Sequence, residues 1–217
     1  MYKRQPYLSA VAAAIAVYVI VGALIELAQR AMTNARSARG ALSRFFGLPL
    51  SAFGTAFAHA GVGLTLLGLA ATGWGVENIT TMRQGDFVAL GPYRIGIEEL
   101  AQRRGPNYLE SYAVMRIERS GQPFARIEPG KRSYPTRKMT RAEAGIATLG
   151  LGQIYAALGE SHEDGGVDVR LYYKPLVTLI WIGALVMALG GACSLADRRL
   201  RVGAPRRAPA AVAQAAE

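Results

Sequence analysis

His59 is the residue whose type and position most clearly suggest chemistry, because it is an imidazole inside an uncharged segment, residues 50–74. An ionisable side chain is costly in hydrocarbon, and it usually faces a partner helix, a cavity or a metal centre. A haem iron is one such partner, since histidine is a common axial ligand. A hydrogen bond from the ring to a carbonyl or carboxylate of a neighbouring helix is the other interpretation that spacing alone allows.

Other candidates for chemistry are few in this chain of 217 residues. The second histidine, His162, lies in a polar loop at 159–166 and is expected to be solvated. Its neighbours Glu163 and Asp164 lack the helical spacing of a zinc pair. The single Cys193 falls in an apolar segment, so no disulfide framework or redox pair is expected. The sequence shows no glycine-rich phosphate loop and no Ser-His-Asp set, which argues against nucleotide and hydrolase chemistry.

Three uncharged segments would position these residues, at 6–25, 50–74 and 175–196. Each reaches the roughly 20 residues that cross a bilayer as a helix. We therefore predict three transmembrane helices, with the lipid bilayer as a partner. A cleavable signal peptide is the alternative for the first segment.

The net charge of the chain is +10, and counting the charged residues of each segment predicts how the chain is oriented in the membrane. The loop 26–49 carries four arginines against Glu26 alone, and the tail 197–217 carries five arginines against two acidic residues. Both are predicted to be cytoplasmic. The stretch 75–174, with 14 basic and 12 acidic residues, is then predicted to lie on the opposite side of the membrane, which is the periplasm when the membrane is a bacterial inner membrane, and residues 1–5 form an N-terminal tail. Because the excess charge borders the membrane, no nucleic-acid partner is expected.

Residues 75–174 are the size of one small domain and alternate mostly with a period of two. Strands are predicted at 107–118, 122–128 and 167–173, with Ser120-Gly121 as a hairpin turn. Thr140 and Glu143 fit a helix capping box, but glycines follow at 145, 150 and 152, so 144–158 is left as helix or strand. The predicted fold is three transmembrane helices plus a small β-rich extracytoplasmic domain, barrel- or sandwich-like.

The second apolar segment has a stripe of small residues at steps of three and four, which lets a neighbouring helix approach closely. The stripe consists of Gly54, Ala58, Gly61, Thr65, Gly68 and Thr72. His59 lies about 140° from it at about 100° per residue. Gly63, one turn later, is expected to leave room there for a flat ligand. Trp74, Tyr172 and Tyr173 are expected to gather at one membrane interface.

From about residue 57 to 201 the chain resembles the C-terminal part of the CcmF family, the haem lyases of cytochrome c maturation. The matching residues occur in order along about two thirds of the chain, which makes the signal specific. They are His-Ala-Gly-Val at 59–62, Gly-Pro-Asn-Tyr at 105–108, Glu-Pro-Gly-Lys-Arg-Ser-Tyr at 128–134, Tyr-Ala-Ala-Leu-Gly-Glu at 155–160, Tyr-Lys-Pro-Leu at 173–176, and Trp-Ile-Gly at 181–183 through Met-Ala-Leu-Gly-Gly at 187–191 to Ala-Asp-Arg-Arg at 196–199.

The resemblance implies a membrane protein that holds a b-type haem between two transmembrane histidines and helps to attach haem covalently to apocytochrome c outside the inner membrane. His59 stands where the second of those histidines would stand, so haem b is the implied cofactor. The implied partners are the other cytochrome c maturation subunits, a haem chaperone and apocytochrome c. The family's other histidines belong to regions that this chain lacks, so it would be one subunit of a split haem lyase or an incomplete product, inactive alone.

A local basic cluster includes Lys131 and Arg132, which we predict to contact haem propionates or an acidic face of a partner. A solvated loop near anionic lipid headgroups explains the same charges. Two other classes of function are considered for the whole chain. One is a non-enzymatic, membrane-anchored interaction module without a cofactor. The other is half of a transporter, against which the lack of an internal repeat argues.

Overall fold

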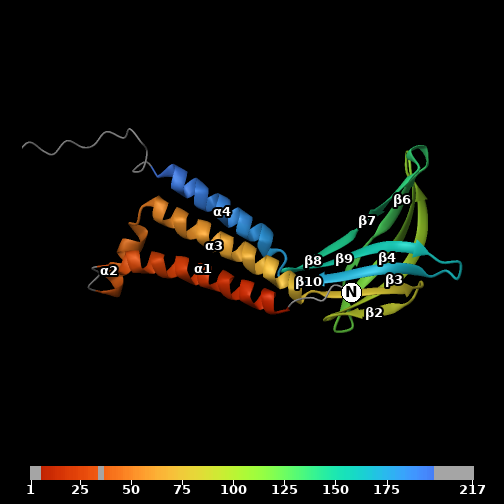
Figure 1. Cartoon of the computed structure of the whole chain (residues 1–217), viewed down its shortest axis with the longest axis horizontal. Helices are drawn as coiled ribbons and strands as arrows, with labels where there is room; N and C mark the ends of the chain where they lie inside the picture. Colours follow the sequence, from red (N-terminus) through yellow and green to blue (C-terminus); the bar gives the residue numbers. More distant parts are fainter. Residues whose placement is uncertain (1–5, 34–36, 198–217) are drawn as a thin grey trace, which may run out of the picture.

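The computed structural model describes residues 6–33 and 37–197, and it consists of a layer of helices joined to a β-sandwich (Figure 1). The predicted N-terminal tail at 1–5 and the basic tail beyond Asp197 lie outside the described residues. Three helices are long and apolar enough to cross a membrane, at Tyr7–Met32, Leu50–Trp74 and Leu179–Ala196. The prediction of three membrane-spanning helices with a β-rich domain is confirmed.

Two helix boundaries differ from those expected. Helix α1, Pro6–Met32, continues past residue 25 because Glu26 and Arg30 form an exposed pair one turn apart, which a helix tolerates at its polar end. Helix α4, Leu179–Ala196, begins later than residue 175 because Leu176 adopts a left-handed conformation with φ 57°. The third spanning helix, α3, covers Leu50–Ala71 and ends in a 3₁₀ turn at Thr72–Trp74.

The basic loop contains a short helix that the sequence reading missed, α2 at Ala38–Phe46. Ser37 begins it, since its side chain accepts a hydrogen bond from the backbone N–H of Gly40. Phe45 packs edge-on against Phe53 of α3, with ring centroids 5.2 Å apart. The capping serine and the two phenylalanines that end the helix were the available signals.

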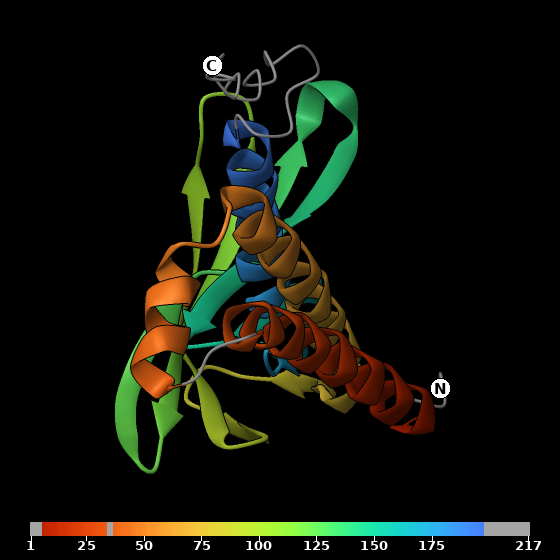
Figure 2. The ribbon, with the colours of Figure 1, turned by 90° about the vertical axis from the view of Figure 1, so that its left-hand side faces the viewer.

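The helices form one layer in which α3 lies between α1 and α4 (Figures 1 and 2). Helix α1 begins beside the sandwich and runs away from it, α3 returns, and α4 leaves again. The α2 segment and the end of α4 therefore lie at the same end of the molecule, opposite the sandwich. This places α2 and the end of α4 on one side of the bilayer; which side faces the cytoplasm stays a prediction.

The β-sandwich has two antiparallel sheets. The first has the order β1-β10-β9-β8 and the second β2-β3-β4-β6-β7, with β5 paired to β4. The strands are β1 Val76–Met82, β2 Phe87–Leu90, β3 Tyr93–Arg104, β4 Leu109–Arg119, β5 Gln122–Ile127, β6 Gly130–Tyr134, β7 Met139–Glu143, β8 Gly145–Leu149, β9 Gly152–Ser161 and β10 Val167–Lys174. A 3₁₀ turn at Pro135–Arg137 joins β6 to β7.

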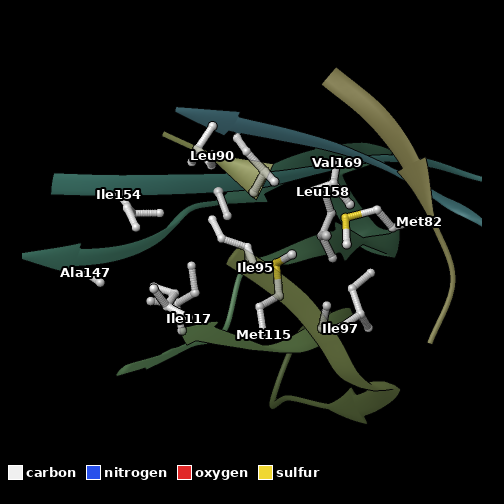
Figure 3. Close-up of a cluster of buried hydrophobic side chains, with 14 of the residues drawn as sticks. Met82, Leu90, Ile95, Ile97, Met115, Ile117, Ala147, Ile154, Leu158 and Val169 are labelled. Carbon is white, nitrogen blue, oxygen red and sulfur yellow. The ribbon is translucent and has the colours of Figure 1, made fainter. Parts of the chain in front are cut away.

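Alternating apolar residues from both sheets form the core, as expected for a sandwich (Figure 3). The fully buried residues of this core include Ile95, Met115, Ile117, Ile154 and Leu171. Because this cluster draws on β1 to β5 and β8 to β10, the sandwich has a hydrophobic core of its own, separate from the helices.

The predicted hairpin at Ser120-Gly121 is confirmed, since both residues have positive φ and join β4 to β5. The undecided stretch 144–158 forms strands β8 and β9, joined by a turn at Gly150 with φ 63°. The capping-box pattern was misleading, because Thr140 and Glu143 both lie in strand β7.

The predicted aromatic cluster at the interface is wrong in part, because neighbouring residues of a strand point to opposite faces. Tyr173 faces inward and packs against Tyr93, with ring centroids 5.2 Å apart, and burial raises its pKa. Tyr172 faces outward and packs against Tyr155. Trp74 is left partly exposed at the end of α3.

Candidate functional site in helix α3

His59 is exposed on the surface of α3, in the half of the helix farther from the sandwich. Its Nδ1 lies 2.9 Å from the carbonyl oxygen of Thr55, one turn earlier. A carbonyl oxygen only accepts, so Nδ1 carries the proton in this contact and Nε2 keeps its lone pair. Among the described residues no hydrogen bond reaches Nε2. A metal-binding histidine usually donates its other ring N–H to a carboxylate, a backbone carbonyl or water, and the contact with Thr55 is one of these arrangements.

One side of α3 is closed by α4, and the predicted stripe of small residues makes this contact. A Cβ built on Gly61 would lie 2.6 Å from the carbonyl oxygen of Gly183, and one on Gly54 would lie 2.7 Å from that of Gly190. Both distances are far below those of real Cβ contacts, so the two backbones touch. The interpretation of the stripe as a helix-packing surface is confirmed.

Helix α1 closes a second side of α3 and overturns the expected role of Gly63. A Cβ on Gly63 would lie 2.5 Å from Cγ1 of Ile20 and 2.9 Å from the carbonyl oxygen of Ala16, both in α1. The space beside Gly63 is therefore filled by a neighbouring helix. Sequence alone could not reveal this, because it does not say where α1 crosses α3.

The open surface next to His59 lies on its other side. Val62 and Leu69 are 43% and 54% exposed, and at about 100° per residue they lie about 60° and 80° from His59, turned away from Gly63. The imidazole thus has apolar neighbours on a surface that the described helices leave uncovered. A flat apolar ligand could approach Nε2 only from this surface.

The far end of α3 is held by a residue distant in sequence. Pro49 precedes the helix and offers no side-chain cap, but Oδ2 of Asp197 accepts a hydrogen bond of 3.0 Å from the backbone N–H of Ser51. Asp197 is only 6% exposed. A carboxylate at a helix N-terminus satisfies a free N–H and interacts favourably with the helix dipole. Asp197 therefore fixes the end of α4 against the start of α3.

The sandwich has one buried charged network, on the outer face of β3, β4 and β6. Glu110 is 2% exposed, and its carboxylate accepts hydrogen bonds from Nε of Arg132 at 2.9 Å and Nε of Arg103 at 2.5 Å. The hydrogen bond from Arg103 is the main cause that lowers the pKa of Glu110. The two guanidinium groups also lie over the rings of Tyr108 and Tyr112.

The structure places Lys131 and Arg132 on opposite faces of β6. Arg132 faces outward to Glu110, whereas Nζ of Lys131 donates to the carbonyl oxygen of Gly159 in the other sheet, at 3.3 Å. They therefore form no common anion site. The hairpin that carries them lies at the end of the sandwich away from the helices, so lipid headgroups do not explain its charge (Figure 1). Neither residue lies near His59.

His162 is exposed but not freely solvated. Its Nε2 lies 2.9 Å from Oδ1 of Asp168, and Thr81 donates to the same oxygen at 2.7 Å. The hydrogen bond to Asp168 raises the pKa of His162 and lowers that of Asp168. The pair ties the tip of the β9–β10 hairpin to β1. Of the residues that the structure describes, no three histidines, cysteines or acidic residues could together hold a metal ion.

Comparison with known proteins gives one family model, described as the CcmF C-terminal beta-sandwich, which matches residues 73–175. This range includes all ten strands. The chain is 44% identical over 209 residues to the cytochrome c-type biogenesis protein CycK of Rhizobium meliloti, covering 96% of the chain and 31% of the relative. It is 37% identical over 193 residues to the cytochrome c-type biogenesis protein CcmF of Escherichia coli, covering 88% and 29%.

A solved structure named cytochrome c heme lyase CcmF has a similar fold, with a TM-score of 0.56 and 15% identity. The similarity covers 81% of this chain and 34% of that one. The chain spans about a third of the length of the relatives that it matches. From its helices, its sandwich and these relatives, the chain belongs to the CcmF family and contains that family's C-terminal β-sandwich.

Proposed function

We propose that this chain is the part of a CcmF-type haem lyase that supplies one axial ligand, His59, to a transmembrane b-type haem and carries the lyase's β-sandwich outside the bacterial inner membrane. The assembled lyase attaches haem covalently to apocytochrome c on the periplasmic side. Other cytochrome c maturation subunits and a haem chaperone complete the assembly. The names of the relatives support the pathway.

The observation that carries this proposal is the state of the His59 ring. Its Nδ1 is occupied by the Thr55 carbonyl oxygen, which leaves Nε2 with a lone pair at an exposed, apolar surface of a membrane helix. A histidine that served only as a polar packing contact would have no reason to present its second nitrogen outward, where hydrocarbon cannot bond to it. An iron ligand needs that nitrogen free.

The residues around His59 fit a haem but supply only one side of it. The carbonyl of Thr55 holds the ring, and Val62 offers an apolar contact on the open surface. The second ligand and the other walls must come from the part of the lyase beyond this chain, which is about two thirds of its relatives.

Depth separates this site from the attachment reaction. His59 lies fifteen residues before Trp74, which is about 22 Å along a helix from the end that meets the sandwich. An apocytochrome peptide could not reach it. A b-type haem held there could supply electrons that keep the substrate haem ferrous. His59 therefore orients a relay or a structural cofactor, and the thioether bonds form at the outer surface.

The depth also separates His59 from the sandwich charges. Lys131 and Arg132 lie at the far end of the sandwich, so they cannot touch the propionates of a haem that His59 binds. If they contact propionates, these belong to the substrate haem, and Arg132 must first give up part of its contact with Glu110. An acidic face of a partner remains the other proposed contact for the two residues.

The test is a reduced-minus-oxidised visible spectrum of the detergent-solubilised assembly, purified with the remaining cytochrome c maturation proteins. We expect a b-type haem signal in the native protein that His59→Ala abolishes while the protein stays in the membrane. His162→Ala is the matched control and should keep the signal. A normal spectrum in His59→Ala would refute the ligand role.

The second candidate function is a membrane-anchored interaction module without a cofactor. The closed core of the sandwich favours it, because such a domain can act as a docking platform without any chemistry of its own. It predicts that neither the native protein nor His59→Ala shows a haem signal, and that both recruit the same maturation subunits in pull-down measurements.

A further inference from the structure

The outer face of the sheet β1-β10-β9-β8 carries an exposed row of apolar and aromatic side chains. Glu77, Tyr172, Tyr155 and Ile146 lie directly opposite one another across the four strands. Ile146 is 56% exposed and Tyr155 is 37% exposed. The hydroxyl of Tyr172 is bonded to Glu77, so the polar end of this row is already satisfied.

A second row lies beside the first and extends it away from the membrane. Ile79, Arg170 and Ala157 are cross-strand neighbours in β1, β10 and β9, and Ile79 is 58% exposed. Together the two rows form what we call the apolar patch. It consists of Ile79, Ile146, Tyr155, Ala157, Arg170 and Tyr172.

The outer face of the other sheet is built in the opposite way. There Glu98 pairs with Arg116 and Arg126, and Arg116 also pairs with Glu118. Charged groups that satisfy one another suit a surface that stays in water, whereas contiguous exposed apolar side chains mark an interaction surface. The two outer faces of one small domain therefore have different neighbours.

Lipid is a poor occupant for the row of the apolar patch that contains Ile79 and Arg170. Arg170 lies four residues before Lys174 at the membrane end of β10, which is about 13 Å along a strand. The polar region on each side of a bilayer is about 5 to 8 Å thick. Strand β10 runs away from the helices (Figure 1). At about 13 Å from Lys174, the row of Ile79 and Arg170 therefore lies beyond a polar region of that thickness.

A protein surface fits better. Tyrosine and arginine, with apolar neighbours, are the side chains that dominate the centres of protein interfaces. Arg170 is exposed between Ile79 and Ala157, and no ion pair holds it among the residues that the structure describes. A protein surface that covers the apolar patch should therefore present apolar side chains around a carboxylate that pairs with Arg170.

We propose that the apolar patch docks the part of the CcmF-type protein that lies beyond this chain, on the same side of the bilayer as the sandwich, through an apolar surface with a carboxylate facing Arg170. We choose this part as the occupant because the chain covers only 31% of a relative, so most of that relative's length consists of other segments that can contact the sandwich. The inference rests on the proposed function as a lyase component.

The test places a photo-crosslinking amino acid at Ile79 or Ile146 in the native assembly and identifies the linked peptides by mass spectrometry. The matched control is Leu109, which is 50% exposed on the other sheet. We expect peptides from the remaining part of the CcmF-type protein at 79 and 146 but none at 109. Arg170→Glu should lower the yield at 79 about tenfold, as loss of a central interface arginine does.

Three results would overturn the proposal: crosslinks to lipid at both positions, crosslinks only to other proteins, or equal yields at Ile79 and Leu109. Exposed substitutions leave the sandwich core intact, and trypsin resistance of the domain checks this for Arg170→Glu. The haem spectrum of the same preparations separates the two ideas. A normal b-type signal without crosslinks refutes the docking surface alone, whereas loss of the signal in His59→Ala is a result about the ligand.

Discussion

The two halves of this molecule reach stability by different means. The sandwich encloses a core of large aliphatic side chains contributed by both sheets, whereas α3 meets α4 through glycines at backbone contact and meets α1 on a second side. The core of the sandwich is therefore closed, whereas α3 keeps one surface that no described helix covers. His59 lies on this uncovered surface, where a ligand or another helix can reach it.

Filling the contact between α3 and α4 should have the largest effect on stability, and it should affect the helices but not the sandwich. Gly61→Leu should separate the two helices, because its Cβ alone would lie 2.6 Å from the carbonyl oxygen of Gly183. We expect a loss of at least about 3 kcal/mol, at the upper end of overpacking effects. Detergent thermal unfolding followed by circular dichroism measures it.

Gly191→Leu is the control for that change, because nothing lies within 4 Å of its added Cβ. A trypsin-resistant sandwich should survive in Gly61→Leu even though the helices have come apart. Loss of both halves together would show that the sandwich depends on the helical layer.

A change confined to the sandwich gives the next largest effect. Glu110→Ala removes the acceptor shared by Arg103 and Arg132, and we expect a loss of about 2 kcal/mol. This is below the ~3–5 kcal/mol for a fully buried pair, because both arginines still reach water. Chemical denaturation of the protein measures it.

Arg126→Ala is the matched control, since this arginine is 69% exposed in its pair with Glu98 and should cost less than about 1 kcal/mol. In Glu110→Ala the haem signal should be unchanged. A spectral change there would mean that the two halves are coupled more closely than their separate packing implies.

The far end of the helical layer offers a smaller test. Asp197→Ala should cost about 1 kcal/mol by leaving the N–H of Ser51 without its carboxylate. Hydrogen exchange at the start of α3 should then rise. Unchanged protection at residues 51–53 would mean that another group caps the helix equally well.

The smallest effect belongs to the exposed pair of His162 and Asp168. Because the pKa of His162 is raised above its ordinary 6.5, the pair stabilises the fold fully below that value and loses its contribution as the pH rises through the raised pKa. His162→Gln should therefore lower the thermal midpoint slightly at pH 6 and not at pH 9. An equal difference at both values would contradict the ion pair.

The sequence predicted the features that depend on local pattern. Uninterrupted apolar stretches indicated the three spanning helices, and Ser120-Gly121 between alternating strands indicated the hairpin, because each signal lies within a few residues. The Thr140 and Glu143 pattern misled for the same reason. It satisfies the local rule for a helix start, but pairing of β7 with β6 decides the structure.

In the candidate site, too, the sequence showed the local feature but not the features that depend on tertiary contacts. His59 was visible because one polar residue in an apolar helix needs no partner to be noticed. The burial of Glu110 was not visible, since it arises from cross-strand neighbours in β3 and β6. The sequence did not show that Ile20 of α1 fills the space beside Gly63, because neither helix sequence indicates where the two helices cross.

The pairing of β1 with β10 has a mechanical consequence. Val76 follows Trp74, the last residue of the 3₁₀ turn after α3, by two residues, and it lies opposite Tyr173, shortly before α4. Both connections from the sandwich to the helices therefore leave through one hydrogen-bonded pair of strands. A domain attached in this way has no flexible tether on which to swing. If α4 slid along α3, β10 would have to shift relative to β1, and the hydrogen bonds between these two strands resist such a shift. A movement of the helices should therefore move the whole sandwich.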